Sequence, residues 1–185
     1  MKLPSINNIP LSYIQYVVKI DASSPSGLTW LYRKDMPNRW NTRFANKPAG
    51  CKSTNSDAYQ KWGIKITYKG KQKGLQASRV VFLLQNEYLT KGKEVDHIDG
   101  NSLNNNPLNL RETNRFQNSY NSKLRKNNTS GHKGICWYAS KSKWVVRIRK
   151  NGKNHFLGLF ANKEDAIKTS IEARKKLHGD FGRDK

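Results

Sequence analysis

Apolar residues in the first part of the chain form short runs between turn-forming residues. Val17–Ile20 and Leu28–Arg33 flank the turn-rich stretch DASSPSG, and Ile64–Tyr68 precedes the stretch KGKQKG. Runs of this length bounded by Gly, Pro, Asp and Ser predict strands joined by turns. Residues 1 to about 93 are therefore expected to form short strands and turns, with KGKQKG as a turn.

The segment Ala77–Leu89 has a different pattern. Its centre is a continuous apolar run, Val80–Leu84, which would cover much of the circumference of a helix rather than one stripe. A helix that is apolar nearly all round is buried. This segment is expected to be a buried helix.

The C-terminal part reads as three strands and a helix. The strands are expected at about 134–138, 144–149 and 154–160, with Asn151-Gly152 as a tight hairpin turn. Asn162 and Asp165 resemble a capping box that opens a helix running to about Leu177. Several residues of this helix can cover a sheet: Ala166, Ile167, Ser170, Ile171 and Ala173.

Alternation along the middle strand separates its two faces. Trp144, Val146 and Ile148 share the face that packs on the helix, while Val145, Arg147 and Arg149 share the other. Arginines on an open sheet face suit a DNA groove, where they contact guanine edges or phosphates. The alternative is that they only solubilise the open face.

Charge favours a polyanionic partner. Lys and Arg total 35 against 13 acidic residues, giving a net charge of +22, and the stretch from Thr113 to Lys163 has twelve basic residues and no acid. Phosphate contact explains such a block better than an ordinary solvated surface, which mixes both signs. No apolar run approaches the roughly 20 residues of a membrane span, and Cys51 and Cys136 form no metal-ligand pattern.

These observations predict an α+β protein with two domains. The polar, basic stretch RKNNTSGH, residues 125–132, is expected to be a linker. The domains are then residues 1–128 and 129–185, and the second is a small three-stranded antiparallel sheet packed on one helix.

The segment Glu94–Leu110, EVDHIDGNSLNNNPLNL, is unusually rich in asparagine. A calcium loop fails on spacing, because Ile98 stands where a third-position oxygen ligand is needed. A zinc site lacks enough Cys or His nearby. A plain loop of Asx turns stays open as an alternative.

Phosphodiester cleavage gives the segment a function. His97 can act as the base that activates water, and Asp96 can ligate a hard cation such as Mg²⁺ or Mn²⁺. Both reach one site only if their strand ends there, which the following DGN favours. The next helix, expected from an N-cap at Thr113 with an inward stripe of Phe116, Tyr120 and Leu124, presents Asn118 as a second ligand.

The stretch VDHIDGNSLNNNPLNLRETNRFQNSYN, within about 94–124, resembles the HNH nuclease motif of the His-Me finger (ββα-metal) superfamily, as found in phage and intron homing endonucleases. The resemblance implies His97 as general base, Asn109 as the central asparagine that braces the loop, and Asp96 and Asn118 as ligands of one divalent metal. Many relatives carry His-Arg on the preceding helix, where this chain has Ser78-Arg79. Candidate DNA contacts around the motif are Arg79, Arg111 and Arg115.

The C-terminal pattern GICWY…KW…GK…LG.F…EDA…LHG resembles the Apetala-type (ethylene-response-factor-like) DNA-binding domain, which lays its sheet in the major groove. That resemblance implies DNA contacts from Tyr138, Lys143, Arg147 and Arg149. Cys136 and Tyr138 stand where plant members carry arginines, so their target sequence is not carried over.

Together these features predict a divalent-metal-dependent HNH endonuclease that hydrolyses double-stranded DNA, of phage or mobile-element origin, acting in the cytoplasm of a bacterial host. No membrane and no obligate protein partner is expected. The main alternative is a non-catalytic, sequence-specific DNA-binding regulator; an RNA-binding or ribosome-associated protein is a second.

Overall fold

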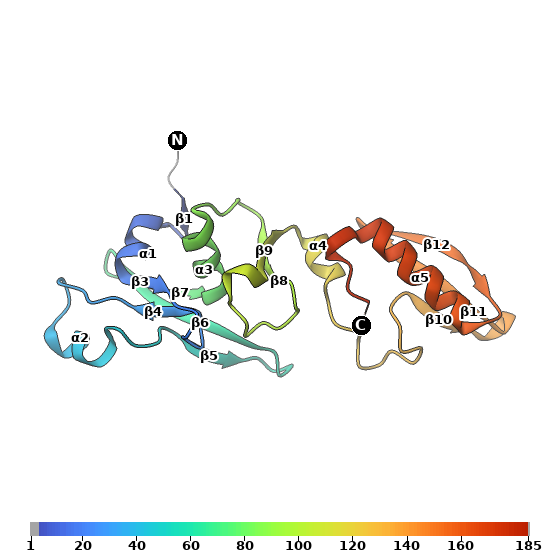
Figure 1. Cartoon of the computed structure of the whole chain (residues 1–185), viewed down its shortest axis with the longest axis horizontal. Helices are drawn as coiled ribbons and strands as arrows, with labels where there is room; N and C mark the ends of the chain where they lie inside the picture. The colour runs from blue at the N-terminus through green and yellow to red at the C-terminus, as the bar shows by residue number, and fades with distance from the viewer. Residues whose placement is uncertain (1–3, 185) are drawn as a thin grey trace. The chain divides into compact units, whose positions relative to one another are not determined.

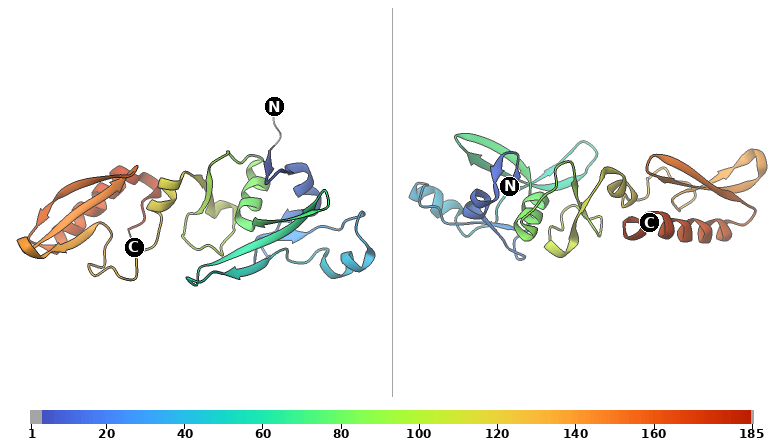
Figure 2. Two further views of the ribbon diagram at one scale, coloured as in Figure 1. Left: turned by 180° about the vertical axis from the view of Figure 1, so that it is seen from behind. Right: turned by 90° about the horizontal axis from the view of Figure 1, so that it is seen from above.

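The computed structural model describes residues 4–184 and has the mixed α+β fold predicted from the sequence, with small sheets of two or three strands (Figures 1 and 2). The chain forms two compact units, Met1–Glu112 and Thr113–Lys185, here the N-terminal and C-terminal units. Within the described residues, no helix is long and apolar enough to cross a membrane.

From residue 4 onward, the N-terminal unit contains four small sheets and three helices. Its elements, in chain order, are β1 (Ser5–Ile6), β2 (Ile9–Pro10), α1 (Leu11–Val17), β3 (Val18–Ile20), β4 (Leu28–Trp30), α2 (Asn38–Phe44), β5 (Cys51–Thr54), β6 (Gln60–Tyr68), β7 (Lys71–Gln76), α3 (Ala77–Asn86), β8 (Glu94–His97), the 3₁₀ turn η1 (Pro107–Asn109) and β9 (Leu110–Thr113). The sheets are β1-β2, β3-β4, β5-β6-β7 and β8-β9.

Helix α3 is the buried helix predicted from the sequence, and it forms the core of this unit. Val80, Val81 and Leu83 are fully buried and belong to one apolar cluster with Ile14 of α1 and Ile64 of β6. Burial of each such side chain contributes about 1.5–3 kcal/mol. The core therefore fixes α3 next to the strands that carry the asparagine-rich loop (Figure 1).

Helix α3 ends at Asn86, earlier than the predicted Leu89. The next residue, Glu87, adopts a left-handed conformation with φ 58°, and its N–H bonds the carbonyl of Leu83. A left-handed residue of this kind terminates a helix.

Three predictions for the N-terminal region were wrong in detail. Helices α1 and α2 lie before residue 77, where short strands and turns were expected, and Val17 ends α1 instead of starting a strand. The turn in KGKQKG is only Lys69-Gly70, because Tyr68 pairs with Lys71 and the rest of the stretch continues as β7. Strand β7 has a single buried side chain, Leu75, so its sequence lacks apolar alternation.

The C-terminal unit contains α4 (Arg115–Tyr120), β10 (Ile135–Tyr138), the 3₁₀ turn η2 (Ala139–Lys141), β11 (Lys143–Lys150), β12 (Lys153–Phe160), α5 (Lys163–His178) and the 3₁₀ turn η3 (Gly179–Phe181). The three strands form an antiparallel sheet in the order β10-β11-β12. Lys150 pairs with Lys153 across Asn151 and Gly152, both at positive φ, which confirms the predicted hairpin.

Helix α5 packs on one face of this sheet, as predicted (Figure 2). Asn162 caps the helix, but its side chain accepts a hydrogen bond from Glu164 N–H, so the predicted box with Asp165 was wrong. Val146 and Ala166 are buried in the core between sheet and helix. The predicted covering residue Ile171 is exposed, and Arg174 and His178 are buried on the helix in its place.

Helix α4 is shorter than predicted. Thr113 ends β9, and Asn114 is the N-cap, forming a capping box with Gln117. The helix ends at Tyr120, so Leu124 lies outside it, and Phe116 is exposed rather than part of an inward stripe. The compact C-terminal unit includes α4, whereas the domain boundary predicted between residues 128 and 129 stays a prediction about the two functional modules.

Candidate active site

The loop between β8 and β9 contains the asparagine-rich segment and is braced by its own side chains. Asn109 accepts a hydrogen bond from the backbone N–H of Asp99 at 3.0 Å and donates to the Asp99 carboxylate at 3.0 Å and to the Asn104 carbonyl at 2.8 Å. Asn104 in turn donates to Asp99 at 2.8 Å. The asparagines thus form the bonded loop that the sequence predicted.

Asp99 is the charged centre of this network. Partial burial by itself raises the pKa of its carboxyl, but hydrogen bonds from Asn101, Asn104 and Asn109 and the charge of His97 together lower that pKa below its usual value. Asp99 therefore stays ionised at neutral pH and accepts the loop's hydrogen bonds.

His97 is the last residue of β8, and a turn follows directly, so the strand ends where the sequence required it. Its Nε2 lies 2.9 Å from Oδ1 of Asn105. Nδ2 of Asn105 donates to the carbonyl of Ser26 at 2.8 Å, and a carbonyl only accepts. The amide oxygen of Asn105 must therefore face His97, and Nε2 carries the hydrogen in the neutral ring.

Gly27 permits the packing that holds Asn105. Its φ is +78°, and a Cβ at this position would lie 3.1 Å from both Cβ and the carbonyl oxygen of Asn105. A side chain here would thus be strained and would push Asn105 away from His97. The β3–β4 turn is the support behind the histidine.

Asp96 is buried on β8 and forms an ion pair with Arg111 of β9. Oδ2 of Asp96 accepts from Nε and Nη2 of Arg111 at 3.2 and 3.1 Å. Arg111, a predicted DNA contact, thus lies against the predicted metal ligand. Arg79 of α3, another predicted DNA contact, donates to the carbonyl of Lys93 just before β8 at 3.2 Å.

Asn118 lies on α4, in the C-terminal unit, and its backbone N–H donates to the Asn114 carbonyl within the capped first turn. Among residues 4–184 there is no cluster of three or more His, Cys, Asp and Glu side chains suited to a metal. Asp96 and Asn118 offer hard oxygen ligands, and Mg²⁺ takes few protein ligands and keeps several waters. The residue types fit that cation.

The sheet of the C-terminal unit presents the other predicted DNA contacts on its open face. Tyr138 pairs with Lys143, and Arg147 pairs with Phe156; all four side chains are exposed. Arg149 is exposed two residues further along β11. Val145 shares this face but is buried, so the open face is less polar at its centre than alternation predicts.

Residues 75–120 match the family model of the HNH endonuclease. Protein 3.8 of Escherichia phage T7, whose name states no activity, is 35% identical to the chain over 118 residues, which are 63% of this chain and 92% of the phage protein. The chain belongs to the family of this phage protein. The matched HNH endonuclease domain contains Asp96, His97, Asn109 and Asn118, and it is the domain of a nuclease.

The HNH homing endonuclease I-HmuI, in a structure described as showing DNA binding and cleavage, matches with a TM-score of 0.42 and 16% identity, over 96% of this chain and 91% of that one. The resemblance of the C-terminal sheet and helix to an Apetala-type domain stays a prediction.

Sequence reasoning missed Asn105 and Ser26, which orient His97. Three consecutive asparagines, Asn104–Asn106, gave a signal for a bonded loop but not for which of them is buried.

Proposed function

We propose that the protein is a divalent-metal-dependent endonuclease that hydrolyses phosphodiester bonds in double-stranded DNA. The observation that carries the proposal is the contact between His97 Nε2 and Asn105 Oδ1. This contact assigns the hydrogen to Nε2 and leaves Nδ1 as the basic nitrogen of the neutral ring. A histidine held in one tautomer by a buried amide is prepared for proton transfer.

In the proposed reaction, Nδ1 of His97 takes a proton from water, whose oxygen forms a bond to phosphorus while the bond to the leaving oxygen breaks. Asn105 holds the ring, and Asn109 holds the loop in which the ring lies. Asp96 and Asn118 would hold one Mg²⁺ or Mn²⁺. The metal, when bound, neutralises charge on the scissile phosphate and the leaving oxygen.

Arg111 has two roles in this proposal. It neutralises the Asp96 carboxylate through two hydrogen bonds, and its guanidinium is placed beside the residue that would hold the metal. A guanidinium next to a metal site is suited to a phosphate oxygen of the substrate. Arg79 and Arg115 are proposed as further contacts to the phosphate backbone of the DNA.

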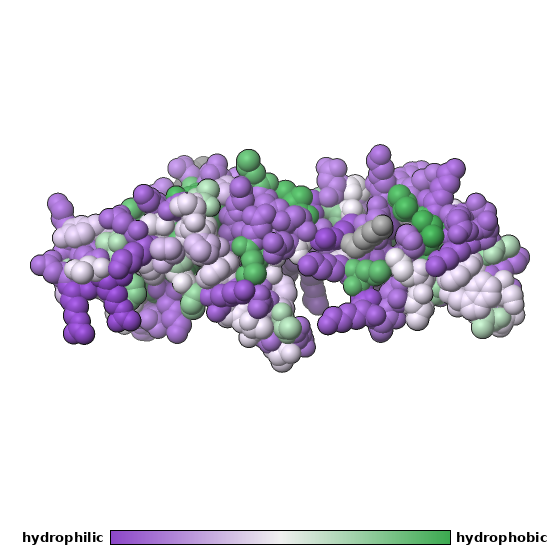
Figure 3. Space-filling view, turned by 60° about the horizontal axis from the view of Figure 1, so that its bottom comes forward, coloured by the Kyte–Doolittle hydropathy of each residue, from purple (hydrophilic) through white to green (hydrophobic). Residues whose placement is uncertain are grey.

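The sheet of residues 129–185 is proposed as a DNA-binding module of the Apetala type, separate from a nuclease module in residues 1–128. Support comes from exposed Tyr138, Lys143, Arg147 and Arg149 on its open face, with α5 covering the other face. The face drawn in Figure 3 is mostly hydrophilic, as expected for a chain of net charge +22. A phage or mobile-element origin and action inside a bacterial host belong to the same proposal.

The test is cleavage of supercoiled plasmid by the full chain with Mg²⁺, with EDTA and the His97→Ala variant as controls. Nicked or linear DNA that needs both the metal and His97 supports the proposal. Asn118→Ala should raise the Mg²⁺ concentration needed for half-maximal cleavage, whereas Asn127→Ala, in an exposed loop, should not. Plasmid that is bound but never cut would instead favour a non-catalytic DNA-binding regulator.

A further inference from the structure

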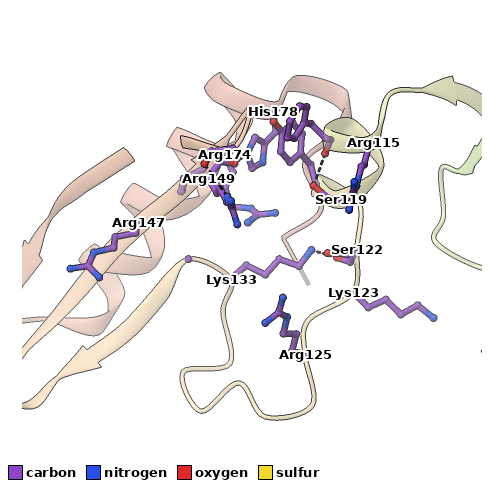
Figure 4. A pocket seen from close by; sticks show the side chains of 15 residues that line it. Arg115, Ser119, Ser122, Lys123, Arg125, Lys133, Arg147, Arg149, Arg174 and His178 are labelled. Atoms are coloured by element: carbon purple, nitrogen blue, oxygen red, sulfur yellow. Dashed lines mark hydrogen bonds between the residues drawn. The ribbon is translucent and has the colours of Figure 1, made fainter. Parts of the chain in front are cut away.

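A basic pocket lies within the C-terminal unit; it shares Arg147 and Arg149 with the open face but is not lined by Tyr138 or Lys143. Its volume is about 810 Å³, within the range of ligand sites. Seven of its lining residues are Lys or Arg, and none of its lining residues is Asp or Glu: Arg115, Lys123, Arg125, Lys133, Arg147, Arg149 and Arg174. Figure 4 shows Arg125, Lys133, Arg149 and Arg174 around a common space.

The wall formed by α4 is fixed by Tyr120. Its hydroxyl donates to Oδ1 of Asn151 at 3.1 Å and accepts from the Asn151 N–H at 2.8 Å. Its ring stacks on His178 with centroids 3.8 Å apart and planes 5° apart. His178 Nε2 donates to the carbonyl of Arg149 at 2.9 Å, which ties helix α5 to β11 behind the stack.

The opposite wall depends on Lys133. Its carbonyl accepts from Ser170 of α5 at 2.9 Å, and its ammonium donates to the carbonyls of Ser122 and Arg183. These two bonds use two of the three ammonium donors. Gly134, with φ +75°, lets the chain approach β11, since a Cβ there would lie 2.7 Å from the Arg147 carbonyl.

Positive charge is concentrated around Lys133 beyond what its neighbours neutralise. Arg174 is buried and pairs with Asp184 at 3.3 Å, a carboxylate that is half exposed. Burial first, and then repulsion from Arg174 and Arg183, lowers the pKa of Lys133 to about 8. An anion between these groups would relieve that repulsion.

We infer that this pocket is a second DNA contact, which binds phosphodiester groups of the DNA backbone between α4 and the C-terminal half of β11. Guanidinium forks match phosphate oxygens in geometry and charge. The volume exceeds the needs of one oxyanion, and the ring of Phe116, 45% exposed, lines the pocket and can lie against a sugar or base. Arg147 and Arg149 belong both to this pocket and to the proposed DNA-binding face.

The inference rests on DNA as the proposed substrate, and it adds a role for α4. This helix carries Asn118, a proposed metal ligand, and also lines the pocket through Phe116 and Ser119. A backbone phosphate held there would fix α4 against the DNA without a hydrogen bond to a base edge. Contacts of this kind set position rather than sequence preference.

The test measures DNA binding by the full chain carrying His97→Ala, without metal, so that cleavage does not enter. Fluorescence anisotropy follows a labelled duplex and a labelled single strand of equal length at several NaCl concentrations. The pocket variant is Arg125→Gln with Lys133→Gln. The matched control removes two exposed lysines of α5 outside the pocket, Lys168→Gln with Lys176→Gln.

The plot of log K against log salt has a negative slope. Each lost phosphate contact reduces the magnitude of that slope by about 0.9 on duplex DNA and about 0.7 on a single strand. In the pocket double variant, the magnitude of the salt slope should therefore fall by about 1.8 on duplex DNA or by about 1.4 on single strands. In the control double variant it should fall by less than about 0.5. The strand type that shows the loss identifies whether paired or unpaired DNA occupies the pocket. Equal slopes for the pocket pair and the control pair would overturn the inference.

Melting curves accompany each variant, because Lys133 also holds the chain through Ser122 and Arg183. If the pocket double variant has a reduced melting temperature, the single variant Arg125→Gln is the test, because Arg125 is exposed. A decrease in the magnitude of the salt slope of about 0.9 on duplex DNA, or about 0.7 on a single strand, supports the inference. An unchanged slope overturns it. A parent chain that binds DNA but does not cut plasmid would refute the proposed cleavage while leaving this result standing. Absence of DNA binding would refute both.

Discussion

The amide of Asn105 links His97 to the β3–β4 turn: its oxygen faces Nε2 of the histidine at 2.9 Å, and its nitrogen donates to Ser26 at 2.8 Å. Asn105 is buried, so neither bond competes freely with water. The position of the imidazole therefore depends on a residue outside the proposed catalytic set.

Replacing Asn105 by Ala should lower single-turnover cleavage about 10–100-fold, because the ring loses the partner that fixes its tautomer and orientation. DNA affinity should stay near that of the parent. Asn105→Asp should move the acidic limb of the rate-versus-pH profile to higher pH, since a carboxylate beside the imidazole favours its protonated form. A purely structural role for Asn105 predicts a different result. In both variants the rate would then fall in step with the melting temperature, and the acidic limb of the rate-versus-pH profile would not move.

His97→Ala should cut DNA at least about 10²-fold more slowly than the parent, which is the lower range for loss of a general base. It should bind DNA about as tightly, because the base contributes to the rate and not to substrate affinity. In the parent, the rate should fall as pH drops through the range where imidazole protonates. Single-turnover cleavage and a melting curve on the same variant decide; full-speed cutting by a folded His97→Ala chain would end the mechanism.

The pair Asp96–Arg111 predicts a link between metal and stability. The two side chains are 8% and 17% exposed, so Arg111→Ala should cost about 3 kcal/mol in the metal-free chain by removing the charge that neutralises Asp96. A divalent cation bound at Asp96 should restore part of that loss. Urea unfolding with and without Mg²⁺ measures this effect: Mg²⁺ should stabilise Arg111→Ala more than the parent, and equal stabilisation of the two chains would show that Asp96 does not hold the metal.

The open sheet face gives a prediction about specificity. Arg147 of β11 is exposed opposite Phe156 of β12, and Arg147→Ala should weaken DNA binding. A contact to a base edge would appear as relaxed site preference, and a contact to phosphate as a salt slope reduced by about 0.9. Lys168→Gln, exposed on the helix that covers the other face, is the control. Unchanged affinity and unchanged site choice in Arg147→Ala would exclude a DNA contact by this arginine.

The sequence predicted the sheet of the C-terminal unit well, because alternation and the Asn151-Gly152 turn are local signals. Asp96 and His97 could be predicted from their chemistry and from the turn that ends β8. The role of Asn105 could not, since its partner Ser26 lies 79 residues away and only tertiary packing selects one asparagine of three.

The early end of α4 is a second feature that the sequence could not predict. The apolar spacing of Phe116, Tyr120 and Leu124 favoured a longer helix, but Tyr120 is held by Asn151 and stacks on His178. Those partners are distant in sequence, so the periodicity of α4 alone gave no signal for its early end or for the basic pocket beside it.

Lys133 makes stability and DNA binding depend on pH above neutrality. Its pKa is about 8 in the folded chain, against an ordinary value of 10.5, because of burial and then of Arg174 and Arg183, with Asp184 opposing. Between about pH 8 and 10.5 the unfolded chain holds a proton that the folded chain has lost, so this group's contribution to folding stability rises with pH there. Below pH 8 its charge is present in both states and the cost of burying it is constant.

A phosphate in the pocket favours the charged form of the Lys133 ammonium. His178, which also lines the pocket, has its pKa lowered mainly by burial and stays neutral in this range. DNA binding should therefore weaken as pH rises through about 8, and binding at pH 8 should take up protons. Calorimetry in two buffers of different ionisation enthalpy measures that uptake. Lys133→Arg should bind without it because arginine stays charged, and Lys133→Gln should bind more weakly and also without it; the same uptake in both variants would place the titrating group elsewhere.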